Sequence, residues 1–79
     1  MKLDFYLKNM KNAFDIATKS IDKGASKTGY ITGYLTGALD GVRSVAIEDG
    51  EIGLVDYNIL IAQARRYEEA LEKYESKSI

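Results

Sequence analysis

Apolar residues recur at alternating steps of four and three along the first part of the chain. They are Leu3, Leu7, Met10, Phe14, Ala17 and Ile21. This spacing is the a/d pattern of a heptad, and it predicts a helix over about 3–23 with one apolar seam. Lys23 followed by Gly24 supports an end there, because a cation and a left-handed glycine are typical of helix C-termini. Other large residues lie off this seam and either widen the buried face or form a contact surface: Phe5, Tyr6 and Ile16.

The central stretch from Thr28 to Arg43 reads TGYITGYLTGALDGVR, a repeat of a four-residue unit. Four residues turn an α-helix about 40° beyond a full turn, so the repeated glycines would form a bare, slowly winding strip. These glycines are Gly29, Gly33, Gly37 and Gly41. The opposite side would carry Ile31, Leu35, Leu39, Val42 and Ala46. The pattern therefore predicts a helix over about 27–48.

A β-strand is the alternative interpretation of the same stretch, because Thr and Tyr alternate there with Gly, Ile and Leu. A strand with glycine at alternate inward positions packs poorly, and no second strand is evident in the sequence. The helical spacing also continues through Val42 and Ala46. These observations favour the helix.

The glycine repeat predicts a contact surface. Each glycine costs about 0.5–1 kcal/mol relative to alanine in a helix interior, and a domain is stable by only about 5–15 kcal/mol. Close approach of another helix or of an aromatic ring would offset that cost. A chain of 79 residues buries only somewhat more than half of the surface of its unfolded state and is correspondingly marginal alone. We therefore expect the strip to be an association or tight-packing face, and the protein to be a homo-oligomer.

A second heptad seam, rich in aromatic residues, predicts a third helix over about 54–75. Its members are Tyr57, Leu60, Ala64, Tyr67, Leu71 and Tyr74. Gly53 fits the N-cap and Asp56 the N3 position, and Ile52 with Tyr57 fits a hydrophobic staple. Residues 76–79 are expected to be disordered. The whole chain, 1–79, then forms a single all-α domain, a helical hairpin or small three-helix bundle with a glycine-zipper-like central helix.

The segment between the second and third helices resembles the second half of an EF-hand calcium loop. The resemblance rests on Asp49-Gly50-Glu51-Ile52 with Asp56 and Tyr57, since such a loop uses a glycine at its sharp turn and an acid at its end. The earlier ligand positions fall on Val45 and Ile47, which have no side-chain oxygen. We therefore expect a helix-turn-helix corner here and no metal site.

Composition narrows the function classes. The chain has no Cys and no His, which removes thiol nucleophiles, disulfides, thiolate zinc sites and the usual proton shuttle. Its net charge of −1 provides no general field for nucleic acid. Residues 1–27 hold six Lys against three Asp, whereas residues 28–79 hold five basic against nine acidic residues. This asymmetry favours packing of the first segment on the last, or contact between copies.

The expected location is the cytoplasm. The start of the chain is amphipathic and charged, unlike a secretory signal. The longest uncharged run, Thr28 to Leu39, is too short to span a bilayer. We therefore expect no membrane span.

The candidate interaction residues surround the glycine strip: Gly29, Tyr30, Gly33, Tyr34, Gly37, Asp40, Gly41 and Arg43. Asp40 and Arg43 are spaced for a local ion pair, and at an interface they would set register and partner choice. Arg65 and Arg66 are candidate anion contacts or, alternatively, part of a solvated face. The tyrosines belong to the helix interfaces or, with the arginines, clamp a nucleotide or a single strand.

No set of residues indicates catalysis, and no cofactor is expected. The sequence predicts a small non-enzymatic interaction module, an adaptor or inhibitor that acts on another protein through a helical surface. By analogy of composition, this class includes the small proteins of phages and mobile elements. The alternative is an oligomer that binds a nucleotide or other anion between Tyr and Arg side chains at subunit junctions.

Overall fold

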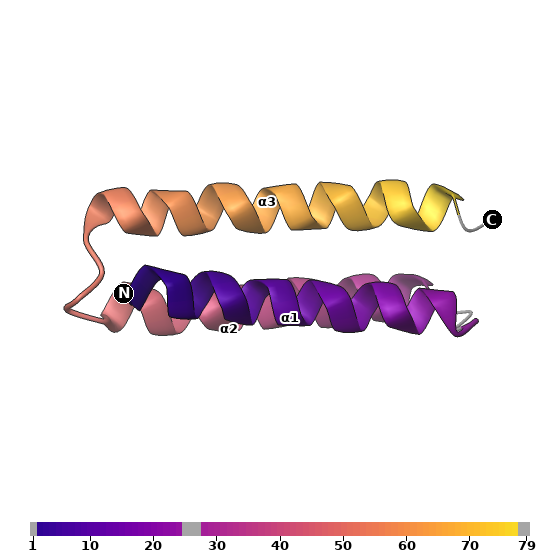
Figure 1. Cartoon of the computed structure of the whole chain (residues 1–79), viewed down its shortest axis with the longest axis horizontal. Coiled ribbons are helices and arrows are strands. Elements are labelled where there is room, and N and C mark those ends of the chain that lie inside the picture. Colours follow the sequence, from indigo (N-terminus) through magenta and orange to yellow (C-terminus); the bar gives the residue numbers. More distant parts are fainter. Residues whose placement is uncertain (1, 25–27, 78–79) are drawn as a thin grey trace.

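The computed structural model describes residues 2–24 and 28–77, and within them the protein consists of three α-helices and no strand. They are α1 (Lys2–Asp22), α2 (Thr28–Glu48) and α3 (Leu54–Lys77). Each helix packs against both others, which confirms the predicted all-α class in its bundle form. The helices run up, down and up along a rod of 42 × 18 × 15 Å, so that the N-terminus and the α2–α3 connection lie at one end and the C-terminus at the other (Figure 1).

The ends of the helices follow from local chemistry. Gly24 has φ of +85° and donates its N–H to the carbonyl oxygen of Ile21 at 3.0 Å, so α1 stops at a left-handed glycine. The carbonyl of Gly53 accepts the N–H of Tyr57 at 2.9 Å, which confirms Gly53 as the N-cap of α3. Helix α3 extends past residue 75, so residues 76 and 77 are helical rather than disordered. Residue 27 and residues 78–79, to which the predicted bounds also extended, lie outside the described residues.

The core is formed by one stripe from each helix. Its fully or nearly buried members are Tyr6, Met10, Ala13, Ala17, Ile21, Ile31, Leu35, Leu39, Ala46, Leu60, Ala64 and Leu71. The apolar stripes predicted for α2 and α3 are confirmed. On α1 the buried face is rotated towards Tyr6 and Ala13, which sequence spacing left off the seam, while Leu3, Leu7 and Phe14 are only partly buried.

Aromatic side chains join α1 to α3 along this core. The rings of Phe14 and Tyr67 stack with centroids 4.9 Å apart and an interplanar angle of 30°. Near the far end of the bundle the Tyr74 hydroxyl donates a hydrogen bond to the carboxylate of Asp22. These contacts explain why the seam of α3 contains tyrosine, since each ring packs inward and the hydroxyl remains near water.

The glycine strip has no role in packing within the chain. Gly29, Gly33, Gly37 and Gly41 are all exposed, and a Cβ atom added at any of them would meet no atom within 4 Å. The close approach expected there is therefore absent from the single chain. The short side chains that let helices approach are instead the buried alanines, among them Ala46 and Ala64. Whether the strip contacts a second chain stays a prediction.

Candidate interaction surface

The tyrosines of the repeat lie beside α1. Tyr30 and Tyr34 line a groove of about 200 Å³ together with Ile31 and, from α1, with Ile16, Ala17 and Ser20. Tyr30 is 79% exposed and Tyr34 41%. Because α2 has to bring Ile31, Leu35 and Leu39 into the core, the four-residue repeat places these two rings at the edge of the α1–α2 contact. This side of the molecule is the outer surface of two neighbouring helices.

We call this side the α1–α2 face and define it by two rows of residues at helical spacing. On α1 the row is Phe5, Asn9, Asn12, Ile16 and Ser20, and on α2 it is Tyr30, Tyr34, Ala38, Gly41 and Val45. Neither row contains a charged residue, although 29% of the chain is charged. Phe5, Ile16 and Val45 are each more than half exposed, as is Tyr30. The face is therefore a partly apolar surface whose two rows hold no charge, with the ammonium of Lys2 lying 5.7 Å from the centre of the Phe5 ring at one end.

The remaining predicted contact residues of α2 are divided between two sides of the helix. Arg43 pairs with Asp40 in a local ion pair one turn apart. It lies two turns from Thr36, which faces α3, so Arg43 belongs to the α3 side of α2. Gly33 and Gly37 lie on the back of the helix, next to the α2 row of the face. The structure thus groups the tyrosines and Gly41 together and places Arg43 away from them.

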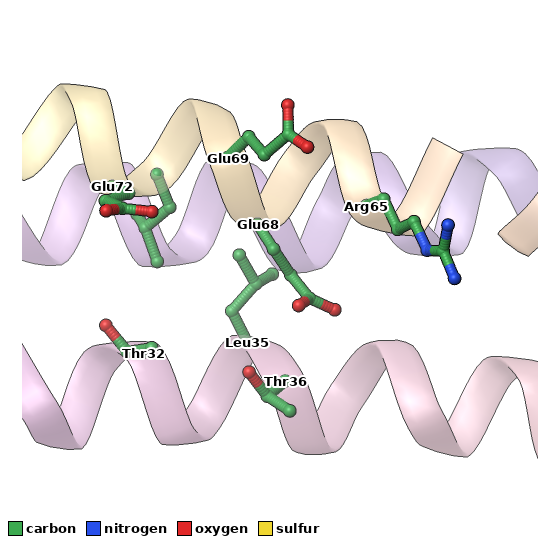
Figure 2. A pocket seen from close by; sticks show the side chains of 8 residues that line it. Thr32, Leu35, Thr36, Arg65, Glu68, Glu69 and Glu72 are labelled. Carbon is green, nitrogen blue, oxygen red and sulfur yellow. The ribbon is translucent and has the colours of Figure 1, made fainter. Parts of the chain in front are cut away.

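The candidate anion contacts lie elsewhere. Arg65 lines a groove of about 330 Å³ between α2 and α3, along with Thr32, Leu35, Thr36, Glu68, Glu69, Leu71 and Glu72. Figure 2 shows Arg65 pointing along α3 away from Glu69 and Glu72. Three carboxylates against one guanidinium give this groove a negative field, which disfavours an anion. Arg66 is exposed. Within one chain, therefore, no arginine is placed beside Tyr30 and Tyr34.

A second exposed apolar surface lies where α2 turns into α3, and the sequence analysis missed it. A groove of about 310 Å³ is lined there by Ala46, Ile47, Ile52, Gly53, Leu54 and Tyr57. The signal that could have found it is the position of Ile47 and Leu54 off the apolar seams of their helices. We call this set, Ile47, Ile52, Leu54 and Tyr57, the corner surface. Val55 and Ile59 are also exposed, but they lie on the opposite side of α3 from Tyr57.

A polar cluster fixes the α2–α3 turn to the start of α1. The buried Tyr6 hydroxyl donates to Oδ2 of Asp49 at 2.6 Å, and the Glu51 N–H donates to Oδ1 of Asp49 at 2.9 Å. The ammonium of Lys2 lies 3.8 Å from Asp49 and 3.9 Å from Glu51. Asp49 thereby organises its own turn and holds α1 in place.

The same contacts shift two pKa values in opposite directions. The hydrogen bond to Asp49, then burial, then the negative charges of Asp49 and Glu51 raise the pKa of Tyr6 to about 12. The hydrogen bond from Tyr6, that from the Glu51 N–H and the nearby Lys2 lower the pKa of Asp49, outweighing its desolvation. Both shifts favour the pair in which the carboxylate is charged and the phenol is neutral.

Replacing Tyr6 with Phe should change the dependence of stability on pH. The folded-state pKa of Asp49 lies below its unfolded value. Its contribution to the free energy of unfolding is therefore present above about pH 4 and is lost as pH falls further. The folded-state pKa of Tyr6 lies above its unfolded value. Its contribution to the free energy of unfolding is therefore present below about pH 10 and is lost as pH rises through about 12. Urea unfolding at a series of pH values should show Tyr6→Phe less stable by a constant amount between these limits, and converging on the wild type outside them. Tyr30→Phe, at an exposed ring, should follow the wild type throughout, and a constant deficit at every pH would contradict the assignment.

Two further findings concern metal and membrane. No group of three or more His, Cys, Asp or Glu side chains is arranged to hold a metal ion among the residues that the structure describes. In the same part of the chain, no helix combines the length and the apolar character needed to cross a bilayer.

A comparison with known protein families, with curated proteins and with solved structures finds no match to this chain.

Proposed function

We propose that this protein is a small non-enzymatic interaction module that self-associates through the α1–α2 face and acts on another protein as an adaptor or inhibitor. The observation that supports this proposal is the face itself, two adjacent helical rows without a charged residue, with Gly41 in the α2 row and the bare Gly33 and Gly37 beside it. Monomeric proteins seldom expose a continuous apolar surface of this kind. Small proteins of phages and mobile elements are one class to which such a module belongs, and the cytoplasm is the compartment that we propose for it.

The dimensions of the face suit a dimer. The bundle measures 42 × 18 Å in its two larger dimensions, so one side offers on the order of 750 Å², close to the roughly 800 Å² per partner of a standard interface. A two-fold axis parallel to the helices would place α1 of each copy antiparallel on α2 of the other. Four helices would then pack as in an antiparallel bundle. The arrangement needs no rearrangement of the fold described above.

Such a dimer would account for the glycine repeat. The side chain of Ile16 on one copy would lie close to Tyr34 and the bare backbone near Gly37 on the other, and close packing there would offset the poor helix propensity of glycine. Lys8, which flanks the α1 row, would approach Asp40 or Glu48, the acidic residues nearest to it along α2 of the other copy.

The experiment is a measurement of mass against concentration by sedimentation velocity. We expect the wild type to approach twice the monomer mass as concentration rises, and Ile16→Asp and Tyr34→Asp to weaken association at least tenfold. Val55→Asp is the matched control, because it places the same charge at an exposed apolar site of α3, away from the α1–α2 face. Helical content measured by circular dichroism should be unchanged in all three variants.

Two results would contradict the proposal. A wild type that stays monomeric at high micromolar concentration would remove self-association through this face. Nucleotide binding that is salt-sensitive and lost in both Tyr34→Ala and Arg65→Ala would instead favour the alternative, an oligomeric nucleotide- or anion-binding protein. Lys73→Ala is the control there, because it removes an exposed cation of the same helix that does not line the groove beside Arg65.

A further inference from the structure

The chain contains two aspartates that are followed directly by glycine. Asp49-Gly50 lies in the turn between α2 and α3, and Asp40-Gly41 lies within α2. In any peptide the backbone nitrogen that follows an aspartate can attack the side-chain carboxyl carbon. The reaction is fastest before glycine, because no side chain obstructs the nitrogen. The two pairs have the same local chemistry, so their surroundings in the fold decide how readily each reacts.

The helix protects Asp40-Gly41. Helix α2 runs without a break from Thr28 to Glu48, so the N–H of Gly41 is used in a hydrogen bond to the carbonyl oxygen four residues earlier. Closure of a five-membered ring would also rotate the backbone of Asp40 out of the helical range of ψ. This pair can therefore react only when α2 opens locally, which costs free energy.

Asp49-Gly50 has no such protection. Helix α2 ends at Glu48 and α3 begins at Leu54, and the connection between them lies beside the start of α1 (Figure 1). The N–H of Gly50 makes no hydrogen bond within the part of the chain that the structure describes. Gly50 is exposed, and a Cβ atom added to it would meet no atom within 4 Å. The attacking nitrogen is therefore free, and neither a helix nor a neighbouring side chain blocks it.

The carboxylate of Asp49 is what the fold restrains. Its Oδ2 accepts the Tyr6 hydroxyl at 2.6 Å, and its Oδ1 accepts the N–H of Glu51 at 2.9 Å. Attack by the Gly50 nitrogen requires the carboxyl group to turn away from these donors. It also requires the neutral acid, because the departing hydroxyl leaves as water. Both hydrogen bonds lower the pKa of Asp49 and so oppose the neutral form.

We propose that Asp49-Gly50 is a site of non-enzymatic modification, where the Gly50 nitrogen attacks the side chain of Asp49 and the hydrogen bond from Tyr6 limits the rate. The nitrogen forms a bond to Cγ and loses its proton, the bond from Cγ to the departing hydroxyl breaks, and one water leaves. The five-membered imide then takes up one water. Opening at the backbone carbonyl leaves the chain running through the side chain, as isoaspartate. The reaction is an isomerisation that needs no reagent besides water.

The product would loosen the turn. Isoaspartate adds a methylene group to the backbone and leaves the carboxylate directly on Cα, so this group can no longer accept both the Tyr6 hydroxyl and the Glu51 N–H. Helix α1 then loses its hydrogen bond to the α2–α3 turn, and we expect a lower melting temperature for the modified protein. The inference goes beyond the proposed function and does not depend on it, because none of these residues belongs to the two rows of the α1–α2 face.

The test is an incubation of the full-length protein at neutral pH in H₂¹⁸O, with and without urea, followed by tryptic digestion and mass spectrometry. Cleavage after lysine and arginine places the two pairs in different peptides, 28–43 and 44–65. Isoaspartyl peptides separate by chromatography, and a heavy oxygen shows that the imide was opened by water. Without urea we expect Asp49 to isomerise about tenfold faster than Asp40 or more, because α2 must open first at Asp40. In urea the two rates should be similar.

Tyr6→Phe should raise the rate at Asp49 about threefold or more, since each unit of pKa changes the neutral fraction of a carboxyl group about tenfold. Its rate at Asp40 should stay unchanged, which separates release of the turn from general destabilisation. Tyr67→Phe is the matched control, because it removes a hydroxyl from a partly buried tyrosine that packs on Phe14. Gly50→Ala should slow the reaction at Asp49 about threefold or more. Gly50 does not have a positive φ, so alanine fits its backbone.

Four results would overturn the proposal. Equal rates at the two aspartates in the folded protein would show that the turn does not expose its pair. Isoaspartate at Asp49 in urea but none in the folded protein would show that the fold prevents the reaction. An unchanged rate in Tyr6→Phe, or a parallel rise at Asp40, would remove the role of the Tyr6 hydroxyl. An unchanged rate in Gly50→Ala would exclude attack by the Gly50 nitrogen. None of these results bears on the sedimentation experiment, so the two proposals fail separately.

Discussion

Replacing Leu39 with alanine should lower the free energy of unfolding by about 2–5 kcal/mol. Leu39 is completely buried in the middle of α2 and belongs to the core shared by all three helices. Its removal leaves a cavity that the neighbouring helices can close only partly. Because a domain of this size is stable by only about 5–15 kcal/mol in total, the loss should take a large part of its stability. Urea unfolding monitored by circular dichroism gives the difference directly.

The matched control is Leu54→Ala, the same substitution at a side chain that is 76% exposed. It should change the free energy of unfolding by no more than about 0.5 kcal/mol. Both proteins should be measured at low micromolar concentration, so that association does not contribute. Equal losses at the two positions would mean that Leu39 is not in the core, and the arrangement of the helices given above would then be wrong.

Enlarging Ala64 to leucine should destabilise the bundle by about 1–3 kcal/mol or more, whereas Gly37→Leu should stabilise the monomer by about 0.5–1 kcal/mol. Ala64 is completely buried, so extra carbon atoms there have no space without movement of a helix. Gly37 has open space around it and exchanges a poor helix former for a good one. Unfolding in guanidinium at low protein concentration compares the two.

The same pair of variants separates packing within the chain from contact between chains. If the glycine strip lies in the proposed dimer, Gly37→Leu should lose association at high concentration while gaining stability at low concentration. Ala64→Leu should be less stable at both. A Gly37→Leu protein that is destabilised even as a monomer would show that the strip packs within its own chain, contrary to the structure.

The positions of the helices could be predicted from the sequence because each depends on neighbours in the chain. The apolar stripes of α2 and α3 repeat at helical spacing, Gly24 takes a backbone conformation that other residues avoid, and Gly53 caps the next helix through its own carbonyl. These are local effects within one or two turns. They are sufficient to set the fold class and the approximate bounds of all three helices.

Which side chains pack together, and which residues share one side of the bundle, could not be predicted in the same way. Tyr6 was left off the seam of α1 because its partner, Asp49, is 43 residues away in sequence and meets it only after the helices pack. The glycine repeat predicted close packing, yet within the chain the buried alanines take that role. The candidate contact residues were placed in one group, whereas the helical rotation of α2 separates Arg43 from Tyr30 and Tyr34.

By itself the sequence determined the three helices, their ends and the apolar stripe that each of α2 and α3 buries, because backbone propensity and residue spacing act over one or two turns. The tertiary structure alone decided how far α1 is rotated, which apolar residues remain exposed, and that most of these gather on the α1–α2 face and the corner surface. The physical reason is that a helix has more apolar positions than two neighbours can cover. Only the packing of all three helices selects which of those positions are left in water.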